Sequence, residues 1–144
     1  MEKLSFLAGK WEGEARVFRG GETAELNQTE EAQYKLDGLL LLIEGVGRRR
    51  GNDEVALQAL GLISYDDEKR TYQMRAFNDG RLLETEAQLL QGGNGLAWGF
   101  TLGEIKTQSV LRINEQREWT EVHEITIGSQ SPKQFMRVRV RRVE

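Results

Sequence analysis

The only histidine of the chain lies in the segment EWTEVHEITI, two residues from a glutamate. His123 and Glu121 share one face of a predicted strand, because residues i and i+2 of a strand point the same way. Trp119, Ile125 and Ile127 fall on that face, and their size favours an inward orientation. Glu121 and His123 would then form a polar pair in an apolar interior, either a ligand site or an acid–base pair. The alternative is a surface histidine, or one held by a carboxylate for structure.

Other site chemistry finds little support in the sequence. The chain has no cysteine, which excludes disulfides, thiolate metal sites and a cysteine nucleophile. A single histidine leaves only carboxylates for a metal site, so no metal and no resident cofactor are expected. The basic run at residues 48–50 lies beside glycines, but no helix follows it, as a phosphate-binding loop requires. No serine stands in a nucleophile-elbow context.

Length and composition indicate one globular domain spanning residues 1–144, with 38% hydrophobic and 30% charged residues. A net charge of −3 is unlike that of a nucleic-acid-binding protein. The longest apolar run, residues 39–43, is too short to cross a bilayer, so no membrane partner is expected. The start of the chain has no apolar stretch of signal-peptide length, and the expectation is a cytoplasmic protein.

The rest of the sequence alternates with a period of two between turns. Sixteen glycines and one proline supply the turns, and Asp-Gly and Asn-Gly pairs suit tight hairpins. The segment MRVRVRR shows the pattern, with Met136, Val138 and Val140 opposite three arginines. About ten such strands are predicted, and only residues 2–9 could form a helical turn. The fold class is therefore all-β: a closed antiparallel up-and-down barrel, with a sandwich as the alternative.

Trp11 lies between two glycines in the stretch GKWEG, at the start of the first predicted strand. We expect its ring to point inward and close one end of the barrel, which leaves the other end open. Gly9 and Gly13 remove side-chain bulk where the chain bends into the strand.

The stretch LSFLAG followed by KWEG resembles the calycin superfamily, which includes lipocalins and fatty-acid-binding proteins. It is more similar to bacterial lipocalin-like proteins of unknown function and to their relatives, the nitrobindins. The stretches YKLDGLLLLIEG, ALGLISYDDEKRTYQMRAFNDGR, EWTEVHEI and QFMRVRVRR add to this resemblance along most of the chain. The resemblance implies a barrel with an interior cavity for a small apolar or amphipathic molecule. The candidate wall residues are Trp11, Tyr34, Tyr72, Met74, Trp98, Phe100, Glu121 and His123.

The resemblance does not carry over the ligand chemistry of these relatives. Nitrobindins hold haem through a histidine in the last strand, and PKQFMRVRVRR has none. His123 lies one strand earlier, and one imidazole can in principle hold haem iron; tight haem binding is nevertheless not expected. Fatty-acid-binding proteins use an inward arginine and tyrosine in the last strand. Here the alternation turns Arg137, Arg139 and Arg141 outward.

Three functions remain open at this stage. The leading one is a binding protein for an apolar or amphipathic small molecule. The second is an enzyme of the same fold, of isomerase or lyase type, with Glu121 and His123 as acid and base. The third is a structural or partner-binding domain whose interior is packed shut.

Charge supports closure of the barrel. Glu12 and Glu14 should point outward from the first strand, as Arg137, Arg139 and Arg141 should from the last. Pairing of these two strands would place acids beside bases, which is the favourable cross-strand arrangement.

The run LLLLIEGV is apolar on both faces of its strand. If Leu39, Leu41 and Ile43 point inward, Leu40 and Leu42 point outward with Val46. An uncovered outer apolar face is unfavourable in water, so we expect a homodimer formed through the 39–46 strand. A neighbouring side chain or the N-terminal turn could provide the cover instead.

Overall fold

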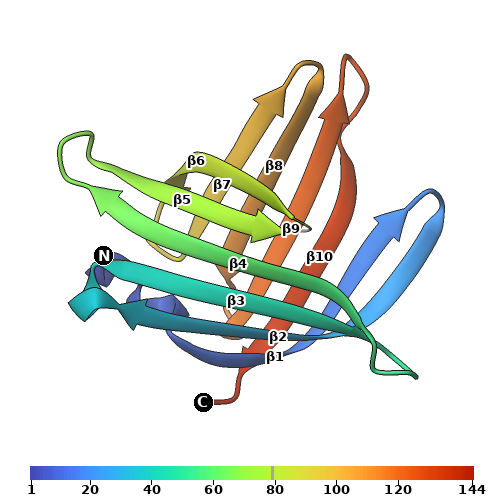
Figure 1. The fold of residues 1–144 in the computed structure, drawn as a ribbon, viewed down its shortest axis with the longest axis horizontal. Coiled ribbons are helices and arrows are strands. Elements are labelled where there is room, and N and C mark those ends of the chain that lie inside the picture. The colour runs from blue at the N-terminus through green and yellow to red at the C-terminus, as the bar shows by residue number, and fades with distance from the viewer. Residues whose placement is uncertain (79) are drawn as a thin grey trace.

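The computed structural model describes residues 1–78 and 80–144. These residues form ten strands and two short 3₁₀ turns (Figure 1). The elements are η1 (Glu2–Leu7), β1 (Gly9–Arg19), β2 (Glu22–Lys35), η2 (Leu36–Gly38), β3 (Leu40–Arg49), β4 (Val55–Asp66), β5 (Thr71–Asn78), β6 (Arg81–Leu89), β7 (Gly95–Leu102), β8 (Ile105–Ile113), β9 (Glu118–Ile127) and β10 (Lys133–Arg142). None of the helical turns in this described part is long and apolar enough to cross a membrane.

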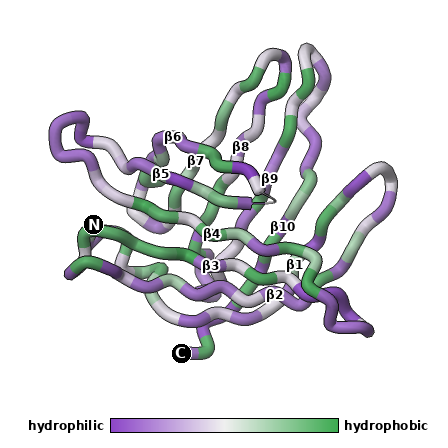
Figure 2. The backbone as a smooth tube through the Cα atoms, viewed as in Figure 1, coloured by the Kyte–Doolittle hydropathy of each residue, from purple (hydrophilic) through white to green (hydrophobic). Residues whose placement is uncertain are grey.

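Each strand pairs antiparallel with the next along the chain, and β10 returns to pair with β1, so the barrel is closed. The predicted up-and-down barrel and its N-terminal turn are therefore confirmed. Figure 2 shows hydrophobic residues concentrated along β3, with hydrophilic residues at the β3–β4 and β4–β5 turns. Closure pairs every strand on both sides and leaves no sheet edge for aggregation.

The pairing of β1 with β10 places acids beside bases, as expected. Glu12 lies opposite Arg141, and Glu14 lies opposite Arg139. The ion pairs themselves differ from this register, because both arginines turn to Glu118 of β9 at 2.9 and 3.0 Å. Glu14 instead pairs with Arg50 at 3.0 Å. A Cβ at Gly13 would clash with the Arg139 carbonyl, so β1 and β10 approach more closely there than a side chain allows.

One end of the barrel is closed around Trp11. Its indole Nε1 donates a hydrogen bond to the Leu7 carbonyl of η1 at 2.9 Å, and Leu7 is fully buried. Its ring meets Trp119 of β9 edge-on, with 5.3 Å between centroids. The Arg142 guanidinium covers the other side of the ring at 4.4 Å from its centroid. Trp11 therefore joins the first turn, β9 and the end of the last strand in one contact.

Towards the opposite end of the barrel, the inward apolar side chains become exposed. Along the inward row of β7, exposure rises from 0% at Leu96 to 38% at Phe100 and 72% at Leu102. The inward row of β9 follows the same course, from buried Trp119 to exposed Ile127. The interior is thus filled at the Trp11 end and is lined by exposed apolar side chains at the other end, which we call the mouth.

The ladder between β6 and β7 is shorter than the others. It has three paired positions, from Ala87 opposite Trp98 to Leu89 opposite Leu96. The other neighbouring strands of the described chain pair at seven or more positions. Beyond the ladder, the Thr85 hydroxyl donates to the Gly99 carbonyl at 2.8 Å and links the two strands by a side chain.

The orientation of β3 agrees with the prediction, but Leu39, which precedes the strand, does not. Leu41 is fully buried and points inward, whereas Leu40 and Leu42 are half-buried on the outer face. Leu39 was expected to point inward but is 68% exposed. The reason is that Leu39 follows the last residue of η2 and still has helical backbone angles, so the period of two begins only after it.

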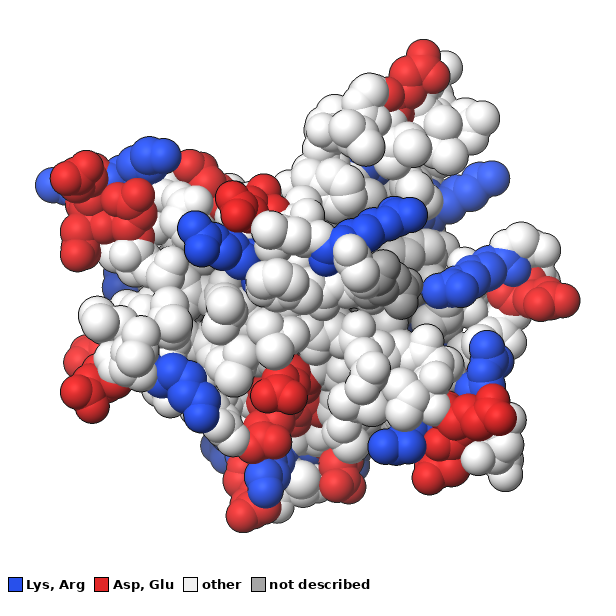
Figure 3. Space-filling view, in the orientation of Figure 1, with Lys and Arg blue, Asp and Glu red and all other residues white. Residues whose placement is uncertain are grey.

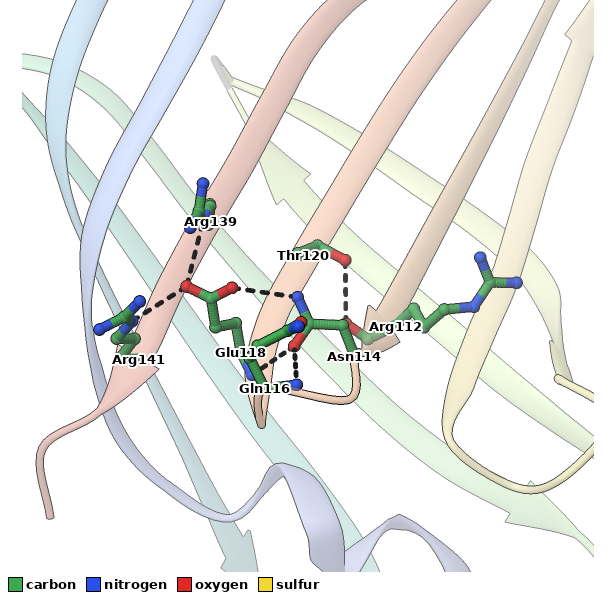
Figure 4. Close-up of polar contacts among 7 residues, drawn as sticks. All are labelled: Arg112, Asn114, Gln116, Glu118, Thr120, Arg139 and Arg141. Carbon is green, nitrogen blue, oxygen red and sulfur yellow. Dashed lines mark hydrogen bonds and ion pairs between the residues drawn. The ribbon is translucent and has the colours of Figure 1, made fainter.

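The turn between β8 and β9 is fixed by hydrogen bonds on the outer surface (Figure 4). The Asn114 side chain accepts hydrogen bonds from the backbone of Gln116 and Glu118 and donates to the Glu118 carboxylate at 3.1 Å. Asn114, Arg141 and Arg139 together lower the pKa of Glu118 to about 2. The start of β9 is thereby tied to both neighbouring strands, which fixes the direction of the side chains that follow.

Replacing Trp11 with alanine should lower the free energy of unfolding by about 3–5 kcal/mol, the usual cost of deleting a buried aromatic ring. Trp11→Phe keeps most of the bulk but loses the bond to Leu7, so its cost should be smaller, with about 1 kcal/mol from the hydrogen bond. Urea denaturation of both variants measures the difference. The exposed Val143 provides the control, since Val143→Ala should have little effect. An unchanged midpoint for Trp11→Ala would contradict the assigned role.

Candidate functional site

The inward rows of β8 and β9 bring four polar groups into one hydrogen-bonded chain. The Ser109 hydroxyl of β8 lies 2.6 Å from His123 Nδ1. His123 Nε2 lies 3.0 Å from Glu121 Oε1, and Trp119 Nε1 donates to Glu121 Oε2 at 2.8 Å. All four residues are buried. An ionised Glu121 accepts a hydrogen bond from Nε2–H, which leaves Nδ1 to accept one from the serine hydroxyl.

A second buried carboxyl group lies on β2, beside Trp11 in the β1–β2 ladder. The Gln28 amide donates to Glu30 Oε1 at 3.0 Å, and both side chains are buried. They lie against Gly47 and Gly45 of β3, where a Cβ would come within 2.6 Å of Gln28 Oε1 and 2.7 Å of Glu30 Oε2. Two glycines in the neighbouring strand therefore leave the room that these polar side chains occupy.

The Glu30 carboxyl group has an unfavourable environment for a negative charge. Burial raises its pKa well above the ordinary value, and the negative charge of Glu121 raises it further. The hydrogen bond from Gln28 opposes these effects. The negative charge of Glu121 thus affects the ionisation of Glu30 across the barrel. We call the buried polar side chains of β2, β8 and β9 the polar interior cluster: Gln28, Glu30, Ser109, Glu121 and His123.

Aromatic rings of β7 and β10 border this cluster. The Trp98 ring of β7 meets the imidazole of His123 edge-on at 6.1 Å between centroids. Phe135 of β10 lies at 5.8 Å from the same ring. Phe135 precedes Met136 at an irregularity in the β9–β10 ladder, which changes the alternation of side chains there. The polar cluster is therefore followed by half-buried apolar surface on the way to the mouth.

The sequence-predicted wall residues do not form one group. Trp98 adjoins the Glu121–His123 pair, and Trp11 reaches Glu121 only through Trp119. Phe100 is nearer the mouth, and Met74 is buried on β5.

The two tyrosines lie apart from His123, near the closed end. The Tyr34 hydroxyl donates to the Met1 carbonyl at 2.8 Å. Tyr72 packs edge-on against Tyr65 and lines a crevice of about 730 Å³ beside the first residues of the chain. These positions separate two regions that the sequence interpretation had combined.

Sequence reasoning missed Gln28, Glu30 and Ser109 as members of the cluster. The segment around Glu30 is polar at nearly every position, so a period of two does not show which face is buried. One available signal was that Gln28 and Glu30 share parity with Leu26 and Ala32. Ser109 shares the parity of Leu111 and Ile113, but the alternation along its strand does not show which side chain it contacts.

Both imidazole nitrogens of His123 are engaged, one by Ser109 and one by Glu121. A haem iron would have to displace one of these contacts to bind the ring. Within the described residues, no group of three or more His, Asp or Glu side chains has the arrangement of a metal site. The cluster is better suited to hydrogen bonding and proton transfer than to metal coordination.

Two solved structures resemble this fold. The crystal structure of Rv2717c from M. tuberculosis aligns with a TM-score of 0.72 at 11% identity, over 99% of this chain and 96% of that chain. The S-type phycobiliprotein lyase CPES from Guillardia theta aligns with a TM-score of 0.67 at 10% identity, over 99% and 92%. No protein-family model and no curated protein sequence matches the chain. The fold is that of a calycin-like β-barrel, and these low identities establish the fold alone.

Replacing Glu30 with glutamine should stabilise the protein at neutral and higher pH. A raised pKa in the folded state means that the folded chain binds this proton more tightly than the unfolded chain, so wild-type stability falls as pH rises above the ordinary glutamate value. Glutamine removes that loss, and we expect a gain of about 2–4 °C in Tm at pH 8, corresponding to about 1 kcal/mol. Melting curves from pH 5 to 8 measure it, with the exposed Glu86→Gln as control. A lower Tm for Glu30→Gln at pH 8 would show that the charge is compensated.

Proposed function

We propose that the protein binds a small amphipathic molecule inside the barrel, with the polar end of the ligand at the Glu121–His123 pair. The observation that carries this proposal is the order of surfaces along the interior. Exposed apolar side chains at the mouth lead to half-buried Trp98, and then to the buried polar cluster. This order matches a ligand that enters with its polar group first and leaves its apolar part near the mouth.

The structural likenesses support binding in general terms only. One of the two similar proteins is named a phycobiliprotein lyase, so this barrel architecture accompanies lyase chemistry in that protein. The nitrobindin-like resemblance of the sequence adds a haem-binding alternative. It is the weaker one, because both His123 nitrogens already have partners.

Filling the mouth from inside should abolish binding of a neutral apolar probe such as N-phenyl-1-naphthylamine. Thr107 of β8 is half-buried on the inward row, while Gln108 beside it is exposed. Thr107→Trp should weaken the affinity at least tenfold, a loss of about 1.4 kcal/mol. Gln108→Trp adds the same bulk outside and should leave the affinity unchanged. Fluorescence titration measures both, and a wild-type protein that binds no probe would favour the packed-interior domain.

A second candidate function is an enzyme of isomerase or lyase type that uses His123 as its acid–base group. The supporting observation is the chain from Ser109 through His123 to Glu121, in which the carboxylate orients the ring and the hydroxyl faces the basic nitrogen. Glu121 would hold the proton on Nε2, and Nδ1 would exchange a proton with Ser109 or with a bound substrate.

Nitrogen-15 NMR of the imidazole tests that arrangement. Neutral His123 should be protonated at Nε2 and unprotonated at Nδ1, because Glu121 accepts from the former. Glu121→Gln should weaken this preference, whereas Glu124→Gln on the outer face of β9 should preserve it. Protonation at Nδ1 in the wild-type protein would remove the basis for the acid–base candidate.

We also propose that the protein forms a homodimer through an apolar patch on the outside of β3 to β6. Leu42 lies opposite Leu62, and Leu60 lies opposite Phe77. Figure 3 shows mostly uncharged atoms over the middle of this face. A groove of about 410 Å³ beside Phe77 and Leu82 adjoins it. The outer apolar patch consists of Leu40, Leu42, Leu60, Leu62, Phe77 and Leu82.

Charges beside the patch favour a second copy as its partner. Glu44 of β3 is opposite Leu60, and Arg75 of β5 is opposite Leu62, so an acid and a base lie on opposite sides of the β4 row. A two-fold axis parallel to β4 places β3 of one copy over β5 of the other. Glu44 then comes near the partner's Arg75, and both apolar patches are covered at once.

Sedimentation equilibrium tests the assembly. The wild-type protein should be a dimer at micromolar concentration, and the double change Leu42→Lys and Leu62→Lys should give a folded monomer. Val143→Lys is the matched control, since Val143 is exposed away from the patch. A wild-type monomer at tens of micromolar would show that the chain tolerates its uncovered patch.

A further inference from the structure

We infer that the polar group of the ligand is a cation with several hydrogen-bond donors, such as a primary ammonium group, held between Glu30 and Glu121. This inference rests on the proposed binding function and names the class of ligand. The structure supports it in three ways: two buried carboxyl groups, an excess of hydrogen-bond acceptors, and, within the described residues, no lysine or arginine paired with either acid.

The interior holds two carboxyl groups and no buried lysine or arginine among the described residues. Its buried ionisable side chains are Glu30, Glu121 and His123. Glu121 contacts His123 at 3.0 Å, and Glu30 takes part in no ion pair among the described residues. Arg142, the arginine at the closed end, is held over Trp11 and donates to the backbone carbonyls of Phe6 and Ala8. The Arg142 guanidinium is therefore engaged by Trp11 and by backbone carbonyls, and not by the two acids.

The cluster also has more acceptors than donors. Glu121 takes the donors of Trp119 and His123, and Glu30 takes one from the Gln28 amide. Gln28 Oε1 is buried and has no hydrogen-bond partner, on a side chain only 2% exposed. An unpaired buried acceptor costs roughly 1–3 kcal/mol, so a ligand that brings donors into the site gains by pairing it.

An ammonium group satisfies both requirements, because it has a positive charge and three N–H donors. Its charge also offsets the repulsion that Glu30 experiences from Glu121. A carboxylate ligand would bring a negative charge and only acceptors to a site that already holds two carboxyl groups, and a hydroxyl group would bring a single donor without charge. The interior thus selects the polar group of a ligand by its charge, whereas the apolar mouth does not distinguish one polar group from another.

Three twelve-carbon compounds that differ only in the polar group test the inference: dodecylamine, dodecanol and dodecanoate, each below its micelle-forming concentration. Competition against N-phenyl-1-naphthylamine at pH 7 measures their affinities for the full chain. Dodecylamine should bind at least tenfold more tightly than dodecanol, and dodecanoate more weakly than either. Native mass spectrometry of the amine complex should show one molecule bound per chain.

Variants assign the preference to the two acids. Glu30→Gln and Glu121→Gln keep the shape of each side chain but remove its charge, and each should reduce the amine preference at least fivefold. Glu124→Gln, on the outer face of β9, should leave it intact. Circular dichroism melting curves confirm that each variant is folded.

The two proposals fail in different ways. Equal affinities for the three compounds, or tightest binding of dodecanoate, would overturn the cationic assignment while leaving the binding function in place. An amine preference that persists in both glutamine variants would also overturn it. Failure of all three compounds and of the fluorescent probe to bind would overturn the binding function itself.

Discussion

The contact between Trp11 and Trp119 is the constraint on which the rest of the structure depends. It joins the first strand to the ninth, and the same indole holds η1 and lies under Arg142, two residues from the end of the chain. A sheet can close only if its first and last strands meet in the correct register, and here the register is set at the end where side chains fill the interior. Because β9 leaves this point with Trp119 inward, Glu121 and His123 must also point inward. The Trp11 contacts that close one end of the barrel and the polar interior cluster are therefore positioned by the same strand, β9.

The interior combines features that stability alone does not require. Two carboxyl groups are buried within electrostatic reach of one another, and an amide oxygen is left without a partner. Apolar side chains of similar volume would avoid these costs. Gly45 and Gly47 maintain the arrangement, since any side chain there would collide with Glu30 or Gln28. Unfavourable polar burial of this kind is common where a site is organised for a ligand rather than for the folded chain.

The sequence predicted the fold well because its strands alternate clearly and its turns carry glycine or asparagine. The inward direction of His123 followed from the large apolar residues that share its face. The pattern failed at Leu39, which follows η2 and still has helical backbone angles, and it was silent around Glu30, where both faces are polar. It also could not single out Arg142 from the run of arginines before it, whose side chains point outward. Side chains that interact across the barrel, such as Glu30 and Glu121, come together only when the barrel closes. The alternation within one strand cannot predict them.

The short β6–β7 ladder has the fewest paired positions of the barrel, and we call this junction the seam. Hydrogen exchange protection follows the cost of local opening, and a ladder of three paired positions with one side-chain link costs the least to separate. Its amides should therefore exchange ahead of those of the longer ladders. Opening this seam would widen the interior sideways and leave Trp11 and its contacts undisturbed. The closed end would then act as the hinge of this opening. A wide molecule would enter between β6 and β7 rather than through the mouth.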